Sequence, residues 1–281
     1  MSDAPPIDLL CTVRGCGRAL RCEGASLRCC VGHSFDRARE GYWNLLQPQD
    51  RRSRLAGDAP GAVAARRRWL ERGFADSLFA DLAAMTAAAE IPESALVVDV
   101  GCGEGTIARR LFAAGRRRVC GIDLSVRAIA LAARAYPEAT WVVANADRAV
   151  PLADGSAHLL LSLFGRRNGA ECLRVLAPGG RLLVAVPAAD DLAELREAVQ
   201  GAASRRERLS AVIASLEPGF EPIERRTWRV RAEHDSDALR DLLAMTYRGA
   251  RFSEQGRLAS LERLDVTLAA ELLMFCPSRP P

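Results

Sequence analysis

Short apolar runs alternate with helical stretches from residue 95 onward, and this alternation is the main structural signal of the chain. Five runs of aliphatic and β-branched residues predict strands, at 96–100, 118–123, 140–144, 158–164 and 181–187. Apolar positions at helical spacing lie between them. Strands that alternate with helices form a parallel sheet with both faces covered, so the sequence predicts an α/β, Rossmann-like fold.

Further elements are predicted on both sides of these strands. Apolar positions from 63 to 89 predict two helices before the first strand. After the fifth strand the pattern predicts one helix from about 190 to 216, a strand near 221–231, a helix near 236–245 and a final strand near 266–275. No apolar run approaches the roughly 20 residues that cross a bilayer, so no membrane association is expected.

Composition adds a mild basic balance to this picture. The 281 residues contain no Lys, so the 39 basic residues are all Arg, set against 35 acids for a net charge of +4. The first ten residues lack the basic and apolar regions of a signal peptide, which favours a cytoplasmic location. In that compartment the nine Cys are better explained as metal ligands, buried thiols or reactive thiols than as disulfides.

Five of the nine Cys fall within the first 30 residues, and His33 follows them. Two close pairs, separated by twelve residues, can each form a turn, and Gly17 and Gly24 suit a hairpin between them. Four thiolate or imidazole ligands in a segment too short for its own core are typical of a Zn²⁺ site. The predicted ligands are Cys11, Cys16, Cys29 and His33.

Two neighbouring thiols leave the ligand set open. Cys22 and Cys30 are competing ligands, and Cys30 in place of Cys29 gives a two-residue spacing to His33. The alternative to a metal site is a group of unliganded thiols in a loosely packed N-terminus.

The strand at 96–100 runs directly into a glycine loop, Gly101-Cys102-Gly103-Glu104-Gly105. Its spacing, G-x-G-x-G, differs from the G-x-G-x-x-G of dinucleotide sites. Asp99 precedes the loop and Glu104 lies within it, and such acids oppose a phosphate. The loop therefore favours a cofactor with positive or neutral groups, such as the amino acid end of S-adenosylmethionine.

Polar residues also follow the next two strands, where ligands of α/β folds bind. Asp123 is placed to accept both hydroxyls of a ribose, and Asn145 is placed to meet an adenine edge. The alternative is a packing turn with solvated acids. The predicted cofactor-binding residues are Asp99, Gly101, Gly103, Gly105, Asp123, Leu124, Asn145 and Ala146.

At this point the motifs resemble a known family. VVDVGCGEG (97–105), GIDLS (121–125) and LAPGGRLLV (176–184) resemble the core of class I S-adenosylmethionine-dependent methyltransferases. The Cys/His module followed by GHSFDRAREGYWNLL (32–46) and AARRRWLERGF (64–74) is similar to the 23S rRNA guanine-N1 methyltransferases of the RlmA/TlrB type. The segment at 163–180 looks closer to the macrolide-resistance branch of that family.

This resemblance implies a function and a division of the chain. It implies bound Zn²⁺ and S-adenosylmethionine, methylation of N1 of a guanine in a domain II hairpin of 23S rRNA, and a homodimer. The implied parts are a zinc-binding RNA-recognition module (1–40), a helical connector (41–90) and the methyltransferase domain (91–281). The chain departs from the family in placing four residues, instead of two, between its first two Cys.

Transfer to guanine N1 also requires removal of a proton, which a side chain within hydrogen-bond reach can accept. Asp191 is the candidate acceptor, and an acid in the first turn of a helix is the alternative of equal weight. Arg166 and Asn168 are candidates for holding the base. Phe164 can stack on the base or pack in the core, and its place beside an apolar strand favours the core.

Two other functions remain open from the sequence: a catalytically inactive RNA-binding homologue and a small-molecule methyltransferase of a biosynthetic pathway. Clustered Arg favour RNA, because guanidiniums suit phosphate contact and base stacking. GC-rich coding also explains Arg without Lys. The clusters are Arg51, Arg52 and Arg54, then Arg66 to Arg68, then Arg166 and Arg167.

Overall fold

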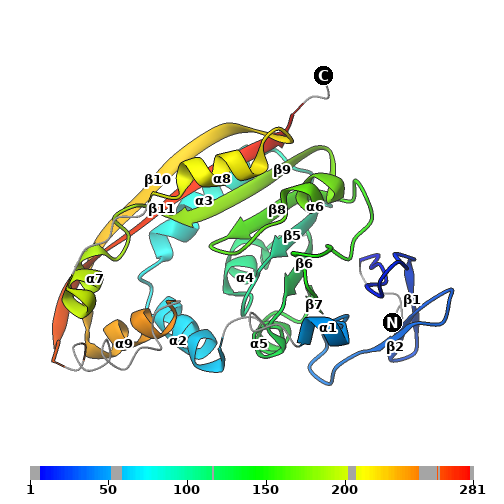
Figure 1. Ribbon diagram of the computed structural model, residues 1–281, viewed down its shortest axis with the longest axis horizontal. Coiled ribbons are helices and arrows are strands. Elements are labelled where there is room, and N and C mark those ends of the chain that lie inside the picture. The colour runs from blue at the N-terminus through cyan, green and yellow to red at the C-terminus, as the bar shows by residue number, and fades with distance from the viewer. Residues whose placement is uncertain are drawn as a thin grey trace.

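The computed structural model describes residues 7–51, 59–115, 117–201, 207–246, 258 and 260–278. Within these residues, one large sheet carries the fold (Figure 1). Its strands lie in the order β10 (Phe220–Asp235), β11 (Arg263–Pro277), β9 (Leu176–Pro187), β8 (Ala157–Leu163), β5 (Leu96–Val100), β6 (Arg118–Asp123), β7 (Thr140–Val143) and β4 (Trp43–Asn44).

The centre of the sheet is parallel, and one edge is antiparallel. β9, β8, β5, β6, β7 and β4 run parallel, whereas β11 runs antiparallel to both β9 and β10. All residues of β5 and β7 are buried, as expected where helices cover both faces. The five strands predicted from the apolar runs are confirmed, and so are the two strands predicted after residue 220.

Helices cover the sheet in two layers. Buried residues of α2 (Pro60–Glu71), α3 (Asp76–Ala88), α4 (Thr106–Phe112), α5 (Val126–Ala135), α7 (Ala193–Gln200) and α9 (Ser236–Ala244) join one core cluster. Those of α6 (Gly169–Val175) and α8 (Leu209–Leu216) join a second cluster on the other face. None of the helices in these described ranges is long and apolar enough to cross a membrane.

One predicted helix is divided in the structure. The pattern from 190 to 216 predicted a single helix, but α7 ends at Gln200 and Gly201 follows with φ of 75°. That left-handed conformation ends a helix, and glycine adopts it without steric cost. A separate helix, α8, begins at Leu209. The prediction was wrong because apolar spacing on both sides outweighed the glycine.

The N-terminal segment forms a small antiparallel sheet of β1 (Leu20–Glu23), β2 (Ser26–Cys29) and β3 (Ser34–Asp36). Its apolar residues belong to the second core cluster of the large sheet. Backbone contacts also attach it, because Leu10 N–H donates to Pro151 O at 2.9 Å and Leu9 bridges Leu152. This N-terminal ribbon is therefore packed onto the α/β domain (Figure 1).

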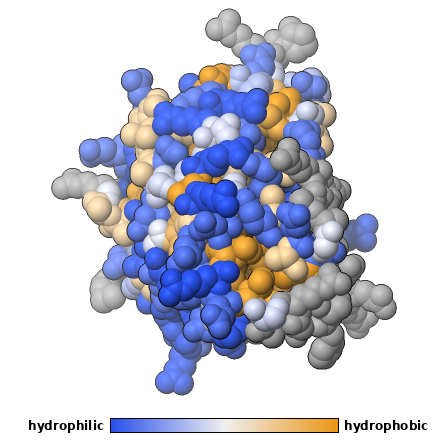
Figure 2. All heavy atoms as spheres, turned by 90° about the vertical axis from the view of Figure 1, so that its left-hand side faces the viewer, coloured by the Kyte–Doolittle hydropathy of each residue, from blue (hydrophilic) through white to orange (hydrophobic). Residues whose placement is uncertain are grey.

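The chain enters the large sheet before the helices begin. β4 pairs with β7, and the short helix α1 (Pro48–Arg51) follows it. The segment predicted as a helical connector, 41–90, thus starts with a strand and continues with α1, α2 and α3. The face seen in Figure 2, which holds β10, α7 and α9, is mostly hydrophilic, with smaller apolar areas between the charged side chains.

Candidate functional site

The four predicted metal ligands meet in the N-terminal ribbon. The ligand atoms of Cys11, Cys16, Cys29 and His33 all lie within 4.8 Å of one another. Cys16 Sγ lies 3.9 Å from Cys29 Sγ, and Nδ1 of His33 lies 3.4 Å from the sulfurs of both Cys11 and Cys29. The structure thus brings together residues that are up to 22 positions apart.

These distances fit a tetrahedral zinc ion. With Zn–S bonds of about 2.3 Å, two thiolates of one tetrahedral site are about 3.8 Å apart. Burial raises the pKa of Cys29, but hydrogen bonds from the backbone N–H groups of Val31 and His33 and from Cys16 and Cys11 together lower it to about 7, which favours the thiolate that binds metal. Cys22 and Cys30 lie outside this cluster, and Cys30 is exposed. The donor set is that of a structural Zn²⁺ site.

The glycine loop adopts a conformation that other residues rarely adopt. Gly101, Gly103 and Gly105 have φ of 78°, 55° and 74°. A Cβ on Gly105 would lie 2.5 Å from the ring of Trp141, so the loop packs tightly against β7. A Cβ on Gly121 would lie 2.1 Å from the same ring. The sequence analysis missed Gly121, because a single glycine inside an apolar strand gave no sign of what faces it.

Three acids gather at this loop. Asp99 is buried, and this burial, together with Asp123 and Glu104, raises its pKa to about 7. Glu104 is buried too, and its Oε2 lies 3.6 Å from Nη1 of Arg66 on α2 but has no hydrogen-bond partner among the described residues. Burial raises the pKa of Glu104.

This arrangement fits the methionine end of S-adenosylmethionine. A buried carboxylate oxygen without a hydrogen bond has a large desolvation cost, which an ammonium group offsets. Arg66 lies beside it and can face a carboxylate. The charges of the site thus match a zwitterion better than a phosphate.

Asp123 ends β6 and holds the turn that follows. Its Oδ2 accepts the N–H of Gly103 at 2.9 Å, and its Oδ1 accepts the N–H of Ser125 at 2.7 Å. Each carboxylate oxygen has a second lone pair, so both can still accept a ribose hydroxyl. Leu124, the next residue, is partly buried against the first core cluster.

Asn145 follows β7 at the same edge of the sheet. Its Nδ2 donates to Oδ1 of Asp50, a buried residue of α1, at 3.0 Å. Ala146 is partly buried against the second core cluster. The carboxyl ends of β5, β6 and β7, which are neighbours in the sheet, therefore carry the predicted cofactor residues side by side.

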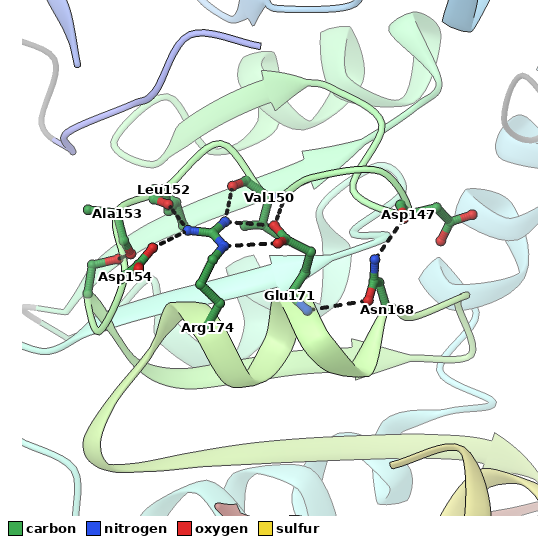
Figure 3. Close-up of polar contacts among 9 residues, drawn as sticks. Asp147, Val150, Leu152, Ala153, Asp154, Asn168, Glu171 and Arg174 are labelled. Carbon is green, nitrogen blue, oxygen red and sulfur yellow. Dashed lines mark hydrogen bonds and ion pairs between the residues drawn. The ribbon is translucent and has the colours of Figure 1, made fainter. Parts of the chain in front are cut away.

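The structure gives Asn168 a role as a helix cap. Its Oδ1 accepts the N–H of Glu171 at the start of α6, and its Nδ2 donates to the carbonyl of Asp147 at 2.9 Å (Figure 3). Close by, Arg174 binds Glu171 and the carbonyls of Val150 and Leu152. Residues 147–154, to which the ribbon is attached, are thereby fixed to α6.

Phe164 and Arg166 lie at the carboxyl end of β8. Phe164 is 45% exposed and has φ of 59°, so the expectation that it packs in the core was wrong. This left-handed backbone comes directly after Leu163, the last residue of β8. Arg166 is exposed and pairs with Asp147 at 2.9 Å.

Asp191 lies just before α7 and is hydrogen-bonded to strand β11. Its Oδ1 accepts the N–H of Ala269 in β11 at 3.0 Å. Burial raises the pKa of Asp191 to about 6, although this hydrogen bond opposes the shift. A carboxyl group that titrates near neutral pH is suited to accept a proton.

Only some of the predicted arginine clusters lie among the residues that the structure describes. Arg66, Arg67 and Arg68 each pair with an acid, namely Glu104, Glu71 and Asp241. Arg167 is half-buried and donates to Ser162 and to the carbonyl of Gly165. Arg52, Arg54 and the side chain of Arg51 lie outside the described residues.

Comparisons with known proteins match both parts of the chain to known families. Residues 97–180 match the family described as "Methyltransferase domain", and residues 11–54 match "RlmA, N-terminal", a zinc ribbon. The fold resembles a provisionally named methyltransferase from Bacillus halodurans, with a TM-score of 0.52 and 17% identity over 70% of this chain and 98% of the other.

Two curated relatives match most of the chain. It is 38% identical, over 82% of each chain, to the 23S rRNA (guanine(748)-N(1))-methyltransferase of Streptomyces fradiae. It is 34% identical, over 93% of its length and 95% of the other, to a Micromonospora griseorubida protein provisionally named 23S rRNA (guanine-N(1)-)-methyltransferase. The chain therefore belongs to the 23S rRNA (guanine-N1)-methyltransferase family, in which a zinc ribbon is joined to a class I, S-adenosylmethionine-dependent methyltransferase domain.

Proposed function

We propose that this protein transfers a methyl group from S-adenosylmethionine to N1 of a guanine in a domain II hairpin of 23S rRNA. The observation that carries the proposal is the union of two sites in one packed unit: a four-ligand metal cluster and a glycine loop with buried acids. The match to the Streptomyces fradiae enzyme covers 82% of this chain. The proposed place of action is the cytoplasm.

The proposal assigns one task to each group of site residues. Cys11, Cys16, Cys29 and His33 hold Zn²⁺, which keeps the ribbon folded. Residues 1–40 recognise RNA, 41–90 connect, and 91–281 carry out the transfer. Asp99, Gly101, Gly103, Gly105, Asp123, Leu124, Asn145 and Ala146 bind the cofactor.

The carboxyl end of β8 and the start of α7 border the reacting base. The bound cofactor supplies an electrophilic methyl group, and the protein must align guanine N1 with it. Phe164, exposed at this edge, is proposed to stack on the base, and Asp191 to accept the N1 proton. Arg166 is proposed to hold the base, while Asn168 shapes the site by capping α6.

Primer extension on 23S rRNA tests the activity. A methyl group on N1 blocks Watson–Crick pairing, so reverse transcriptase stops at the modified base. We expect a new stop when unmodified rRNA is incubated with the protein and S-adenosylmethionine, and none when the cofactor is omitted. A protein that binds S-adenosylmethionine but transfers nothing to rRNA would instead be an RNA-binding homologue.

Three finer proposals have their own tests. Deletion of residues 1–40 distinguishes an rRNA enzyme, which should lose activity, from a small-molecule methyltransferase, which should retain it. A homodimer is proposed from the family resemblance, and light scattering during size exclusion would measure twice the mass of the chain. Macrolide resistance predicts that expression in a sensitive host raises the inhibitory concentration of a tylosin-type drug.

A further inference from the structure

A buried acid of the connector, Asp50, contacts Asn145, the residue proposed to meet the adenine edge of the cofactor. Asp50 is 6% exposed and lies in α1, between the ribbon and the methyltransferase domain. Its Oδ1 accepts from Nδ2 of Asn145 at 3.0 Å. Its Oδ2 accepts the N–H of Gln47 at 3.3 Å and lies 3.3 Å from Nη2 of Arg148.

This contact determines which way the amide of Asn145 faces. An ionised carboxylate only accepts hydrogen bonds, so the Asn145 atom that faces Asp50 must be the NH₂ group. The amide oxygen then points to the opposite side of the same planar group. An oxygen there accepts from the exocyclic amine of adenine but repels the carbonyl oxygen of hypoxanthine.

We propose that Asp50 is a positioning residue that sets the base preference of the cofactor site by orienting the amide of Asn145. The inference rests on the cofactor site of the proposed function and adds a residue from outside the methyltransferase domain. Asp50 does not touch the cofactor in this proposal. It acts through Asn145 alone.

The ribbon fixes Asp50 from the other side. Arg148, its ion-pair partner, donates to the carbonyl of Thr12 at 3.1 Å, and Thr12 directly follows the metal ligand Cys11. Gln47 Nε2 donates to the Thr12 hydroxyl at 3.0 Å. The base preference of the cofactor site is thus set by a side chain that the zinc ribbon holds in place.

Two substitutions at position 50 should act differently. Asp50→Ala removes the acceptor, so the amide of Asn145 can face either way. Asp50→Asn keeps the shape but introduces one NH₂ group. Because Gln47 N–H and Arg148 are both donors, the new amide should turn its oxygen to them and its NH₂ to Asn145. Asn145 must then turn over and present its own NH₂ to the base.

The test is calorimetric binding of S-adenosylhomocysteine and of its hypoxanthine analogue, S-inosylhomocysteine, to the full chain loaded with zinc. We expect the unaltered protein to prefer the adenine ligand by about tenfold, the scale of one mispaired buried hydrogen bond. The ratio should fall to about one in Asp50→Ala and reverse in Asp50→Asn. Asp154→Ala removes another arginine-paired acid, beside Arg174, and should leave the ratio unchanged.

Each outcome separates the inference from the proposed function. The same ratio in the unaltered protein and in Asp50→Asn would overturn the role of Asp50, and primer extension on rRNA would still test the proposed function. If none of the folded proteins binds S-adenosylhomocysteine, both fail. Asp50→Asn is nearly isosteric, so it still decides the matter if thermal melting shows that Asp50→Ala is unfolded.

Discussion

Arg66 Nη1 lies 3.6 Å from the buried Oε2 of Glu104, so a helix of the connector supplies the counter-charge to the glycine loop. A Cβ on Gly103 would lie 3.0 Å from the same Nη1, so the guanidinium lies directly over the loop. The cofactor site is therefore formed by two parts of the chain, and α2 covers the loop that β5 leads into.

Glu104→Gln should weaken binding of S-adenosylhomocysteine by about tenfold, because a neutral amide replaces the charged partner of the ligand's ammonium group. Isothermal titration calorimetry measures the dissociation constant. Glu71→Gln is the matched control, since Glu71 pairs with the neighbouring Arg67 on the exposed side of α2. Equal affinities for both variants would contradict this role for Glu104.

Asp99→Asn should stabilise the protein above neutral pH. The folded-state pKa of Asp99, about 7, is higher than that of the unfolded chain, so its ionisation costs folding free energy. That cost is absent below about pH 4, grows as the pH rises, and is complete above pH 7 at about 4 kcal/mol at most. Urea unfolding should show a larger gain for Asp99→Asn at pH 8 than at pH 4.

Gly105→Ala should destabilise the protein by about 2–4 kcal/mol. The added methyl group would lie 2.5 Å from the Trp141 ring, and it also occupies a left-handed position. Gly155→Ala shares the positive φ, of 64°, but meets nothing within 4 Å, and should cost about 1 kcal/mol. Chemical denaturation followed by circular dichroism compares them, and similar losses would show that packing against Trp141 is unimportant.

Metal content should follow the four clustered residues. Cys16→Ser should lose zinc and lower the melting temperature, because the ribbon depends on the metal for its folding. Cys22→Ser changes a thiol of the same ribbon that lies outside the cluster, and should keep a full equivalent of zinc. Elemental analysis and thermal scans decide, and the same metal content in both variants would contradict the assigned ligand set.

The methylation rate should rise with pH through about 6, as Asp191 loses its proton and becomes able to accept the one from N1. Asp191→Asn should lower the rate at pH 7.5 by about a hundredfold or more and remove this limb of the profile. Asp190→Asn, beside it and paired with Arg229, should keep the limb. Single-turnover kinetics on rRNA across pH 5–8 gives both profiles.

The sequence predicted the centre of the fold well, for a simple physical reason. β5 and β7 are buried on both faces, so their runs are apolar except for Asp99 and Thr140. The Cys/His cluster of the ribbon was also predictable, since ligands of structural zinc sites are mostly Cys and His at short spacing. Both signals are local in the sequence.

What the sequence did not predict depends on contacts between distant residues. The hydrogen bond between Asn145 and Asp50 joins residues that are 95 positions apart, and nothing in the sequence around either residue indicates this contact. Phe164 follows an apolar strand, but its backbone is left-handed and its side chain is exposed, neither of which the apolar run indicates. α7 ends before Gly201, and α8 begins at Leu209. The apolar spacing on both sides of this glycine favoured one continuous helix, so the sequence did not show that the helix ends there.

The two-residue strand β4 has a consequence for handling the protein. It covers the outer edge of β7, and an isolated antiparallel bridge pairs its Trp43 with Arg37, just after the last strand of the ribbon. An unpaired strand edge is a template for aggregation between molecules. Truncation after residue 40 leaves this protective strand in the chain, whereas a cut after residue 46 would remove it and expose β7. A soluble truncated domain must therefore begin before Trp43.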